Sequence, residues 1–257
     1  VEMLGGVPDV PRLRSLCDKH DLFLIGDSCE SMGSLLDGLP LGAKYYDANA
    51  FSFDAGKTIT CGEGGCVVST SPSIIKGCLE YIDHGHENKP NLPKGLDTAR
   101  APGFNFRIHE ITALIGQVQL GRLAEILENQ KIREGVLINS LRSDRFKIRG
   151  TSKNTMHQGD NVILICESSA QAKEIAKLIG DQGFFTKNLP DAMNWHFSKF
   201  WTHIFDDKWK RNNPKIADNH LCPRTYEVLT RSVAIPIMLG KDVEFYQNLG
   251  ITISEGI

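Results

Sequence analysis

The apolar run Leu22–Ile25 most restricts the fold of this chain. Four apolar residues in a row are typical of a strand that is covered on both faces, as the strands of parallel α/β sheets are. The preceding segment Pro8–His20 has the spacing of an amphipathic helix, which favours the same architecture. Asp27 would lie at the carboxyl end of this strand, where open α/β sheets bind ligands. An Asp at this point can also cap the next turn, and this alternative stays open.

A lysine follows the next predicted strand. The alternating run Ala48–Phe53 leads into a turn that holds Lys57, and a glycine-rich bend and a further predicted strand, Gly65–Ser69, come after it. Burying a lysine costs free energy unless its charge is used or neutralised. Partial burial also disfavours the charged form and frees the amine as a nucleophile, so Lys57 is a candidate Schiff-base former. The alternative is a surface lysine in a glycine-rich hairpin.

Composition excludes several other classes of function. The chain has 257 residues, and its 29 Lys and Arg against 31 Asp and Glu give no basic excess for nucleic acid. No apolar run approaches the roughly 20 residues that span a bilayer, and no signal-peptide pattern is present. The seven Cys show no Cys-x-x-Cys spacing. We therefore expect a cytoplasmic enzyme with reduced thiols, no metal site, and no nucleic-acid or membrane partner.

The segment from Ser52 to Gly65 resembles the cofactor-lysine segment of the DegT/DnrJ/StrS sugar aminotransferases, fold type I enzymes that use pyridoxal 5'-phosphate. The resemblance implies that Lys57 forms the Schiff base and that Ser52 contacts the cofactor phosphate. It also implies that Asp27 keeps the pyridine nitrogen protonated. The run Gly103–Glu110 is similar to the family's lead into a long helix. There, Asn105 would reach the cofactor phosphate of the neighbouring subunit, which makes the expected enzyme a homodimer.

Glu30 departs from the family pattern. Many aminotransferases have Gln or His at this position, in contact with the cofactor ring or its phenolic oxygen, and the resemblance assigns Glu30 to that cofactor contact. The sequence from Ser28 to Gly33 is more similar to that of related sugar 3-dehydratases, which use pyridoxamine phosphate. Those enzymes carry His at the position of Lys57. The lysine therefore favours amino transfer, and the dehydratase remains an alternative.

Further segments are similar to one subgroup of the family, which makes 8-amino-3,8-dideoxy-manno-octulosonate for bacterial lipopolysaccharide. They are Lys57–Gly65, Asp83–His86, Gly103–Glu110 and Asn194–His196. The resemblance implies an 8-keto form of the sugar acid 3-deoxy-manno-octulosonate as substrate and glutamate as amino donor, with a nucleotide-linked keto-deoxy sugar as the alternative substrate. His86, Trp195 and His196 are the candidate substrate contacts. Core packing of Trp195, and a plain loop role for His86, are the competing interpretations.

The family resemblance also predicts the domain organisation. It implies an α/β fold of type I: an incomplete large-domain mixed sheet with helices on both faces in residues 1–125, and a small C-terminal α+β domain in residues 126–257. The chain is shorter than members of this family. We expect an N-terminally truncated enzyme that lacks the loop holding the cofactor phosphate at a helix N-terminus. An inactive fragment is the non-enzymatic alternative.

Local patterns predict the remaining elements. Predicted strands are Arg145–Arg149, Asn161–Cys166 and Ser232–Ile235. Predicted helices are Ser71–Ile82, Ile108–Arg142, Ser169–Gln182 and Asp218–Thr230. The long helix Ile108–Arg142 would link the two domains.

Overall fold

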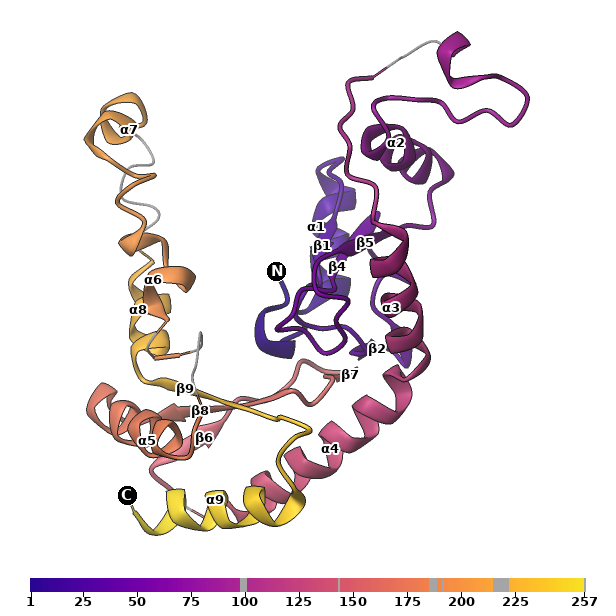
Figure 1. Ribbon diagram of the computed structural model, residues 1–257. Coiled ribbons are helices and arrows are strands. Elements are labelled where there is room, and N and C mark those ends of the chain that lie inside the picture. The colour runs from indigo at the N-terminus through magenta and orange to yellow at the C-terminus, as the bar shows by residue number, and fades with distance from the viewer. Residues whose placement is uncertain (98–100, 143, 185–188, 191, 215–221, 257) are drawn as a thin grey trace. The chain divides into compact units, whose positions relative to one another are not determined.

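The computed structural model describes residues 1–97, 101–142, 144–184, 189–190, 192–214 and 222–256 (Figure 1). The chain divides into two compact units. Unit 1 comprises residues 1–128 and 151–158, and unit 2 comprises residues 129–150 and 159–257. Helix α4 (Leu123–Ser140) contributes residues to both units. No helix in these described ranges is long and apolar enough to cross a membrane.

A three-stranded mixed sheet organises unit 1. Its order is β1 (Ile25–Asp27), β4 (Ala48–Ser52) and β5 (Gly65–Val68). Strands β1 and β4 run parallel, with Asp27 opposite Ala50, whereas β4 and β5 run antiparallel. The predicted strands Ala48–Phe53 and Gly65–Ser69 are therefore confirmed to within one residue. The parallel β1–β4 pair brings the carboxyl ends of these two strands to one edge of the sheet.

The prediction of a covered strand at Leu22–Ile25 is wrong. Leu22 and Phe23 are 57% and 77% exposed, and the strand begins only at Ile25. Two observations explain this. The Leu24 N–H donates to the Asp47 carboxylate at 2.6 Å instead of joining a strand ladder. Within the described part of the chain, β1 also pairs with β4 alone, so its other edge carries no neighbouring strand.

Helices and a second, small sheet complete unit 1. The helical elements are η1 (Met3–Gly5), α1 (Val10–Lys19), α2 (Pro72–Ile82), η2 (Lys94–Leu96) and α3 (Glu110–Gly121). The predicted long helix Ile108–Arg142 is divided at Arg122 into α3 and α4. The small sheet joins β2 (Leu35–Leu36), β3 (Leu39–Pro40) and β7 (Thr155–Met156). Because β7 comes from residues 151–158, this distant segment packs into unit 1.

Unit 2 is built on an antiparallel sheet of β6 (Phe146–Ile148), β8 (Asn161–Cys166) and β9 (Ser232–Pro236), in that order. Two helices, α5 (Ser169–Asp181) and α9 (Val243–Glu255), contribute to one apolar core with the sheet. Its fully buried side chains include Leu164, Ile175 and Tyr246. The shorter elements are α6 (Met193–His196), η3 (Ser198–Phe200), α7 (Asp207–Asn212) and α8 (Pro223–Thr230). Residues 218–221 of the predicted helix Asp218–Thr230 lie outside the described residues.

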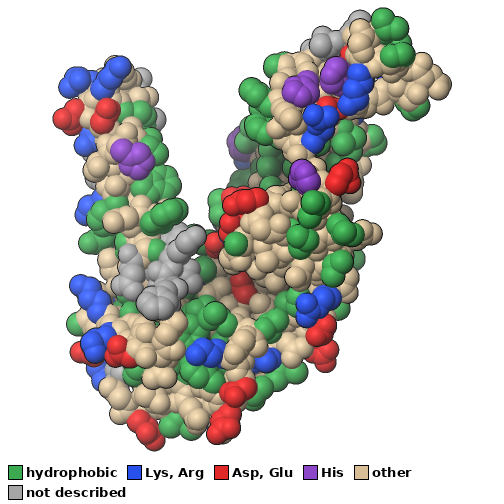
Figure 2. Space-filling view, viewed as in Figure 1, with side chains coloured by type: hydrophobic (Ala, Val, Ile, Leu, Met, Phe, Trp, Pro, Cys, Tyr) green, Lys and Arg blue, Asp and Glu red, His purple; other side chains and the backbone are tan. Residues whose placement is uncertain are grey.

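Helix α3 is apolar but contains no buried residue. Ile111, Leu114 and Val118 are 66%, 61% and 58% exposed. Phe104 and Phe106, just before the helix, are stacked on each other and more than half exposed. Figure 2 shows hydrophobic side chains on the surface of this part of the chain. Exposed apolar side chains that lie close together are typical of surfaces that associate with another chain.

Candidate active site

Asp27 and Ser52 lie at the same edge of the mixed sheet. Asp27 is the last residue of β1, and Ser52 is the last residue of β4. The register of the pair is continued past Asp27 by a hydrogen bond from Ser28 N to the Ala50 carbonyl at 2.9 Å. The structure thus places these two predicted site residues at adjacent strand ends, where an open α/β sheet binds ligands.

The turn after β4 fixes the backbone of Lys57. The Lys57 N–H donates to the Asp54 carbonyl at 3.0 Å, and the Gly56 N–H donates to Asp54 Oδ2 at 3.1 Å. Asp54 N in turn donates to Ser52 Oγ at 3.2 Å. The Lys57 side chain is only 23% exposed, and its Nζ lies 3.3 Å from Glu30 Oε1. Lys57 is therefore partly buried and paired, unlike a lysine on a solvated hairpin.

Glu30 is held from several sides. Its Oε2 accepts a hydrogen bond from Leu4 N at 2.9 Å, while Oε1 faces Lys57. Its backbone carbonyl accepts hydrogen bonds from Gly5 N at 3.0 Å and from Gln158 Nε2. Three contacts that do not involve Lys57 thus fix the residue. The carboxylate is consequently directed at the lysine by the surrounding fold.

The thiol of Cys29 lies near the charged groups Asp27, Glu30 and Lys57, and its pKa is shifted. Burial raises the pKa of its thiol to about 11, and the hydrogen bond and charge of Asp27 act in the same direction. The charge of Glu30 also raises this pKa, while that of Lys57 lowers it. Cys29 N donates to Asp27 Oδ1 at 3.3 Å, and the next residue, Glu30, is paired with Lys57, so the three charged groups lie around this turn.

A buried polar layer supports the turn that carries these residues. Glu2 is 2% exposed and accepts hydrogen bonds from Ser31 Oγ at 2.9 Å and from the Tyr46 hydroxyl. Burial, followed by the contact with Glu2, raises the pKa of Tyr46. Asn49 Nδ2 donates to Ser28 Oγ at 2.6 Å. Sequence reasoning missed Glu2 and Asn49. A polar residue within a strand-like run was the available signal for both.

Asn105 lies in a different part of unit 1. It forms an isolated β-bridge with Asp83, and its Oδ1 accepts a hydrogen bond from Arg107 Nε at 3.1 Å. Arg107 also forms an ion pair with Asp83 at 3.3 Å. Among the described contacts of Asn105, none joins it to Asp27, Ser52 or Lys57. Its reach into a neighbouring subunit stays a prediction.

The three candidate substrate contacts differ in placement. His86 belongs to unit 1, is 30% exposed at its side chain, and has Nδ1 3.3 Å from Asp97. Trp195, in α6 of unit 2, is 72% exposed, so the core-packing interpretation is wrong for this residue. His196 ends α6, and its side chain lies outside what the structure describes. No group of three or more His, Cys, Asp or Glu in the described ranges could hold a metal ion.

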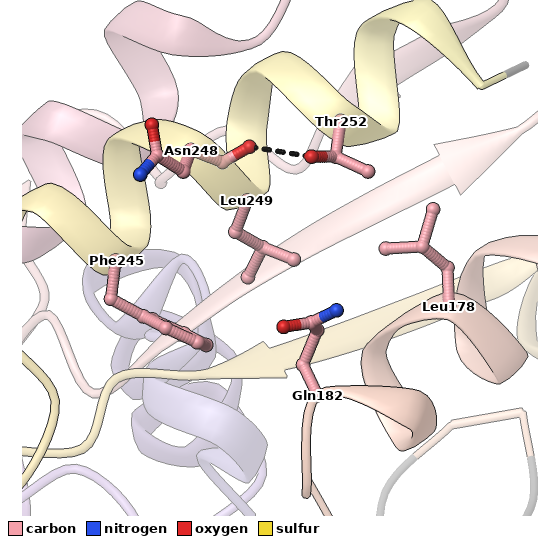
Figure 3. Close-up of a pocket in the computed structure, with 6 residues that line it drawn as sticks. All are labelled: Leu178, Gln182, Phe245, Asn248, Leu249 and Thr252. Carbon is pink, nitrogen blue, oxygen red and sulfur yellow. Dashed lines mark hydrogen bonds between the residues drawn. The ribbon is translucent and has the colours of Figure 1, made fainter.

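The described residues of unit 2 include the lining of two surface pockets. One, of about 190 Å³, lies between α5 and α9 and is lined by residues including Gln182, Phe245 and Asn248 (Figure 3). The other, of about 330 Å³, is lined by residues including Lys173, Met193 and Tyr226. Neither is lined by a predicted site residue. The charged cluster on the β1–β4 edge is therefore the stronger candidate for chemistry.

The family model described as the DegT/DnrJ/EryC1/StrS aminotransferase family matches residues 1–238. This chain belongs to that family. It is 33% identical over 157 residues to the GDP-perosamine synthase of Vibrio cholerae. This match covers 61% of this chain and 41% of the relative. It is 30% identical over 145 residues to the GDP-4-keto-6-deoxy-D-mannose 3-dehydratase of Yersinia pseudotuberculosis, covering 51% and 36%. The matches thus span less than half of these curated relatives.

Solved structures confirm the predicted fold class. The chain superposes on Helicobacter pylori PseC, an aminotransferase of pseudoaminic acid biosynthesis, with a TM-score of 0.77 at 18% identity. This match covers 100% of the chain and 66% of PseC. The protein Spr1654 of Streptococcus pneumoniae gives a TM-score of 0.78 at 20% identity, and this match covers 100% of the chain and 68% of Spr1654. At such identities the likeness concerns the fold, and the chemistry must come from the site.

Proposed function

We propose that this family member takes part in transferring an amino group to a keto sugar, with pyridoxal 5'-phosphate as cofactor. The observation that carries the proposal is Lys57: partly buried, fixed on a turn at the β1–β4 edge, and grouped with Asp27 and Glu30. An amine, a strand-end carboxylate and a hydroxyl at one sheet edge suit the aldehyde, the pyridine nitrogen and the phosphate of this cofactor, respectively.

Each side chain has a distinct part in this proposal. When bound, pyridoxal phosphate supplies an electron sink for the substrate carbon from which a proton is removed. Lys57 Nζ would hold the cofactor's aldehyde carbon and, once released, would take and return that proton. Asp27 would accept a hydrogen bond from the protonated pyridine nitrogen, and Ser52 Oγ would donate one to the phosphate. Glu30 Oε1 would keep Nζ in place between these events.

The apolar surface of α3 supports a homodimer as the working form. Helix α3 has no buried residue, and the segment leading into it carries Asn105. A second copy that covers this surface would bring Asn105 towards the neighbouring site, where its amide would donate to the cofactor phosphate. Sedimentation at increasing protein concentration tests this. A monomer that persists at all concentrations would contradict the dimer.

The substrate is a keto sugar. The names of relatives point to nucleotide-linked sugars: GDP-perosamine synthase in Vibrio cholerae and a UDP-linked altrosamine transaminase in Helicobacter pylori. The subgroup resemblance favours instead the 8-keto form of 3-deoxy-manno-octulosonate. With glutamate labelled by ¹⁵N at its amine, the keto sugar that gains the label is the substrate. A 3-dehydratase, suggested by the name of one relative, would remove a sugar hydroxyl and leave the sugar without the ¹⁵N label.

Cofactor trapping tests the assignment of Lys57. The chain is mixed with pyridoxal phosphate, reduced with borohydride and digested, and the modified lysines are located by mass spectrometry. We expect selective labelling at Lys57. The Lys57→Ala variant should lose this label, whereas Lys44→Ala should keep it because Lys44 is an exposed lysine of the same unit. Even labelling of surface lysines, without preference for Lys57, would contradict the proposal.

A further inference from the structure

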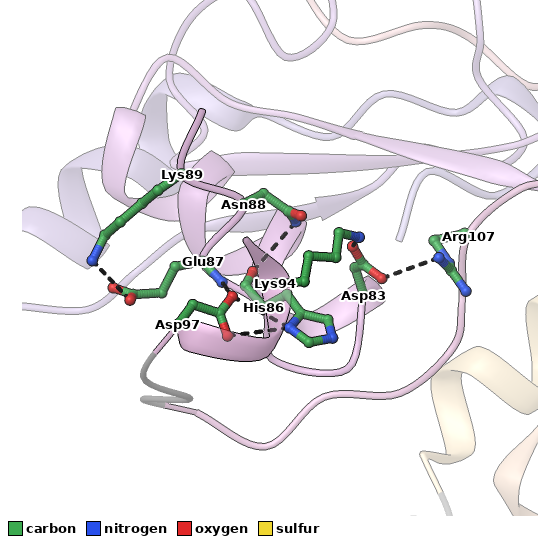
Figure 4. A network of polar contacts seen from close by, with 8 residues as sticks. All are labelled: Asp83, His86, Glu87, Asn88, Lys89, Lys94, Asp97 and Arg107. Atoms are coloured by element: carbon green, nitrogen blue, oxygen red, sulfur yellow. Dashed lines mark hydrogen bonds and ion pairs between the residues drawn. The ribbon is translucent and has the colours of Figure 1, made fainter. Parts of the chain in front are cut away.

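A histidine–aspartate pair lies apart from the Lys57 cluster. His86 Nδ1 is 3.3 Å from each carboxylate oxygen of Asp97, and Glu87 N donates to Asp97 Oδ2 at 3.0 Å (Figure 4). The side chain of Asp97 is 5% exposed, whereas that of His86 is 30% exposed. Burying a carboxylate this deeply is costly unless neighbouring groups hydrogen-bond to it. The imidazole and the Glu87 amide are such groups.

This geometry determines where a neutral His86 ring carries its proton. An ionised carboxylate can only accept hydrogen bonds, so the ring nitrogen that faces Asp97 must donate. Nδ1 therefore carries the proton, and Nε2 is left with its lone pair. Since the carboxylate is held by the Glu87 amide as well, the ring orientation is fixed along with the tautomer.

The neighbouring carboxylates are paired with basic side chains. Asp83, with a side chain 8% exposed, is paired with Lys94 and with Arg107, and Lys89 Nζ is 2.8 Å from Glu87 Oε2. In Figure 4, Asp97 alone of these three carboxylates is directed at the imidazole. Figure 2 shows histidine side chains next to basic ones on this surface of unit 1. The His86–Asp97 contact is therefore a separate pair within a wider ionic network.

The backbone ties His86 to the segment of Asn105. His84 N donates to the Phe104 carbonyl at 3.0 Å, and the Asp83–Asn105 bridge lies next to it. Gly85 and Gly103 pack backbone to backbone, since a Cβ added to Gly103 would lie 2.1 Å from Gly85 N. These backbone contacts hold the loop of His86 against the segment of Asn105.

We propose that Asp97 is a positioning residue that holds His86 with its proton on Nδ1 and presents Nε2 as a hydrogen-bond acceptor in the site that Asn105 serves. The ligand class is a hydroxyl donor, and on the proposed function, on which this part rests, it is a hydroxyl of the keto sugar. Asp97 acts through His86 and does not itself touch the substrate. The tautomer needs neither cofactor nor substrate.

Long-range ¹H–¹⁵N correlation spectra of the ligand-free chain test the tautomer. They are recorded in weakly alkaline buffer, where imidazoles are generally neutral, and His86 is assigned from a His86→Gln variant. We expect a protonated Nδ1 and an unprotonated Nε2. In the Asp97→Asn variant, the amide oxygen would still accept the hydrogen bond from Glu87 N, and the amide nitrogen would face the ring. That nitrogen is a donor, so Nδ1 should become the acceptor and the ring proton should move to Nε2. Asp97→Glu keeps an acceptor and should retain the original tautomer.

Glu87→Gln is the matched control. It removes another nearly buried carboxylate of the same loop and should leave the His86 tautomer unchanged. Circular dichroism establishes that each variant is folded. A wild-type His86 protonated on Nε2 would overturn the proposal, as would an Asp97→Asn variant with an unchanged tautomer.

Steady-state kinetics separate this proposal from the proposed function. Asp97→Asn should raise KM for the keto sugar by about tenfold, the size of one lost hydrogen bond, and leave the half-reaction with glutamate within twofold of wild type. Equal losses in both half-reactions would contradict a role in sugar binding. If the chain transfers no amino group at all, the proposed function fails, and the spectra still decide whether Asp97 sets the tautomer.

Discussion

The Gly85–Gly103 crossing makes a sharp prediction for the Gly103→Ala variant. A Cβ at residue 103 would lie 2.1 Å from Gly85 N and 2.5 Å from the His84 carbonyl carbon, closer than the 3.0 Å below which real Cβ contacts essentially do not occur. Both of these atoms belong to the backbone. No side-chain rotation can relieve the overlap, so the segments around His84 and Phe104 must separate.

The size of the effect follows from the hydrogen bonds that this separation breaks. They are His84 N to Phe104 O at 3.0 Å, Phe104 N to Tyr81 O at 2.8 Å, and Phe106 N to Ile82 O at 3.0 Å. Each contributes a net free energy of about 1 kcal/mol, so losing two or three costs about 2–3 kcal/mol. Replacing Gly by Ala restricts the unfolded chain and offsets about 0.4–1 kcal/mol of this. The local free energy of opening should fall by about 2 kcal/mol.

Native-state hydrogen exchange measures this opening at single amides. A loss of about 2 kcal/mol corresponds to roughly 30-fold faster exchange at His84, Phe104 and Phe106. Gly95→Ala is the control, because Gly95 lies in η2 of the same loop and a Cβ there meets nothing within 4 Å. The control should exchange as slowly as wild type or more slowly. Exchange in Gly103→Ala within threefold of wild type would refute the steric argument.

Two further predictions concern titration. The raised pKa of Cys29, about 11, arises from burial and then from Asp27, so its alkylation by iodoacetamide should keep rising about tenfold per pH unit beyond pH 9; mass spectrometry showing a plateau below pH 10 would contradict this. The pKa of Asp47 is lowered by hydrogen bonds from Leu24 N and from Arg14, so its carboxylate stabilises the fold above the ordinary pKa of Asp. This stabilisation is lost as the pH falls, so between about pH 5 and pH 2 the urea midpoint of the wild type should fall more steeply than that of Asp47→Asn; parallel curves would show that the contacts contribute nothing.

Local sequence patterns predicted the elements whose signals are themselves local. The strand Asn161–Cys166 was predicted at its observed bounds, and the helix predicted at Ser169–Gln182 is found as Ser169–Asp181. The two-residue strands β2, β3 and β7 were missed because two residues carry no periodicity. Helix α9 was missed although it has a signal. Asp242 caps it, and its buried residues Tyr246, Leu249, Gly250 and Ile253 follow helical spacing.

The site was predictable residue by residue but not as a set of contacts. Sequence reasoning named Lys57 and Glu30 separately, and their ion pair appears only when the β1 and β4 ends are adjacent in the fold. The contact of Gln158 with Glu30 could not be predicted from local patterns, because 128 positions of sequence separate the two residues. The apolar run Leu22–Ile25 misled for a related reason. Hydrophobicity indicates that a segment can be buried, but whether it is buried depends on which helices and strands pack against it.

Glu30 shows how a departure from a family pattern gains meaning from structure. The resemblance assigned its position to a contact with the cofactor ring, which a Gln or His can make by donating a hydrogen bond. An ionised carboxylate cannot donate. In this fold, Leu4 N, Gly5 N and Gln158 hold Glu30 independently of Lys57, and one carboxylate oxygen remains for the lysine. Any change in what Lys57 binds would therefore leave Glu30 in place to receive the amine again, so its geometry suits a partner of the lysine better than a donor to the ring.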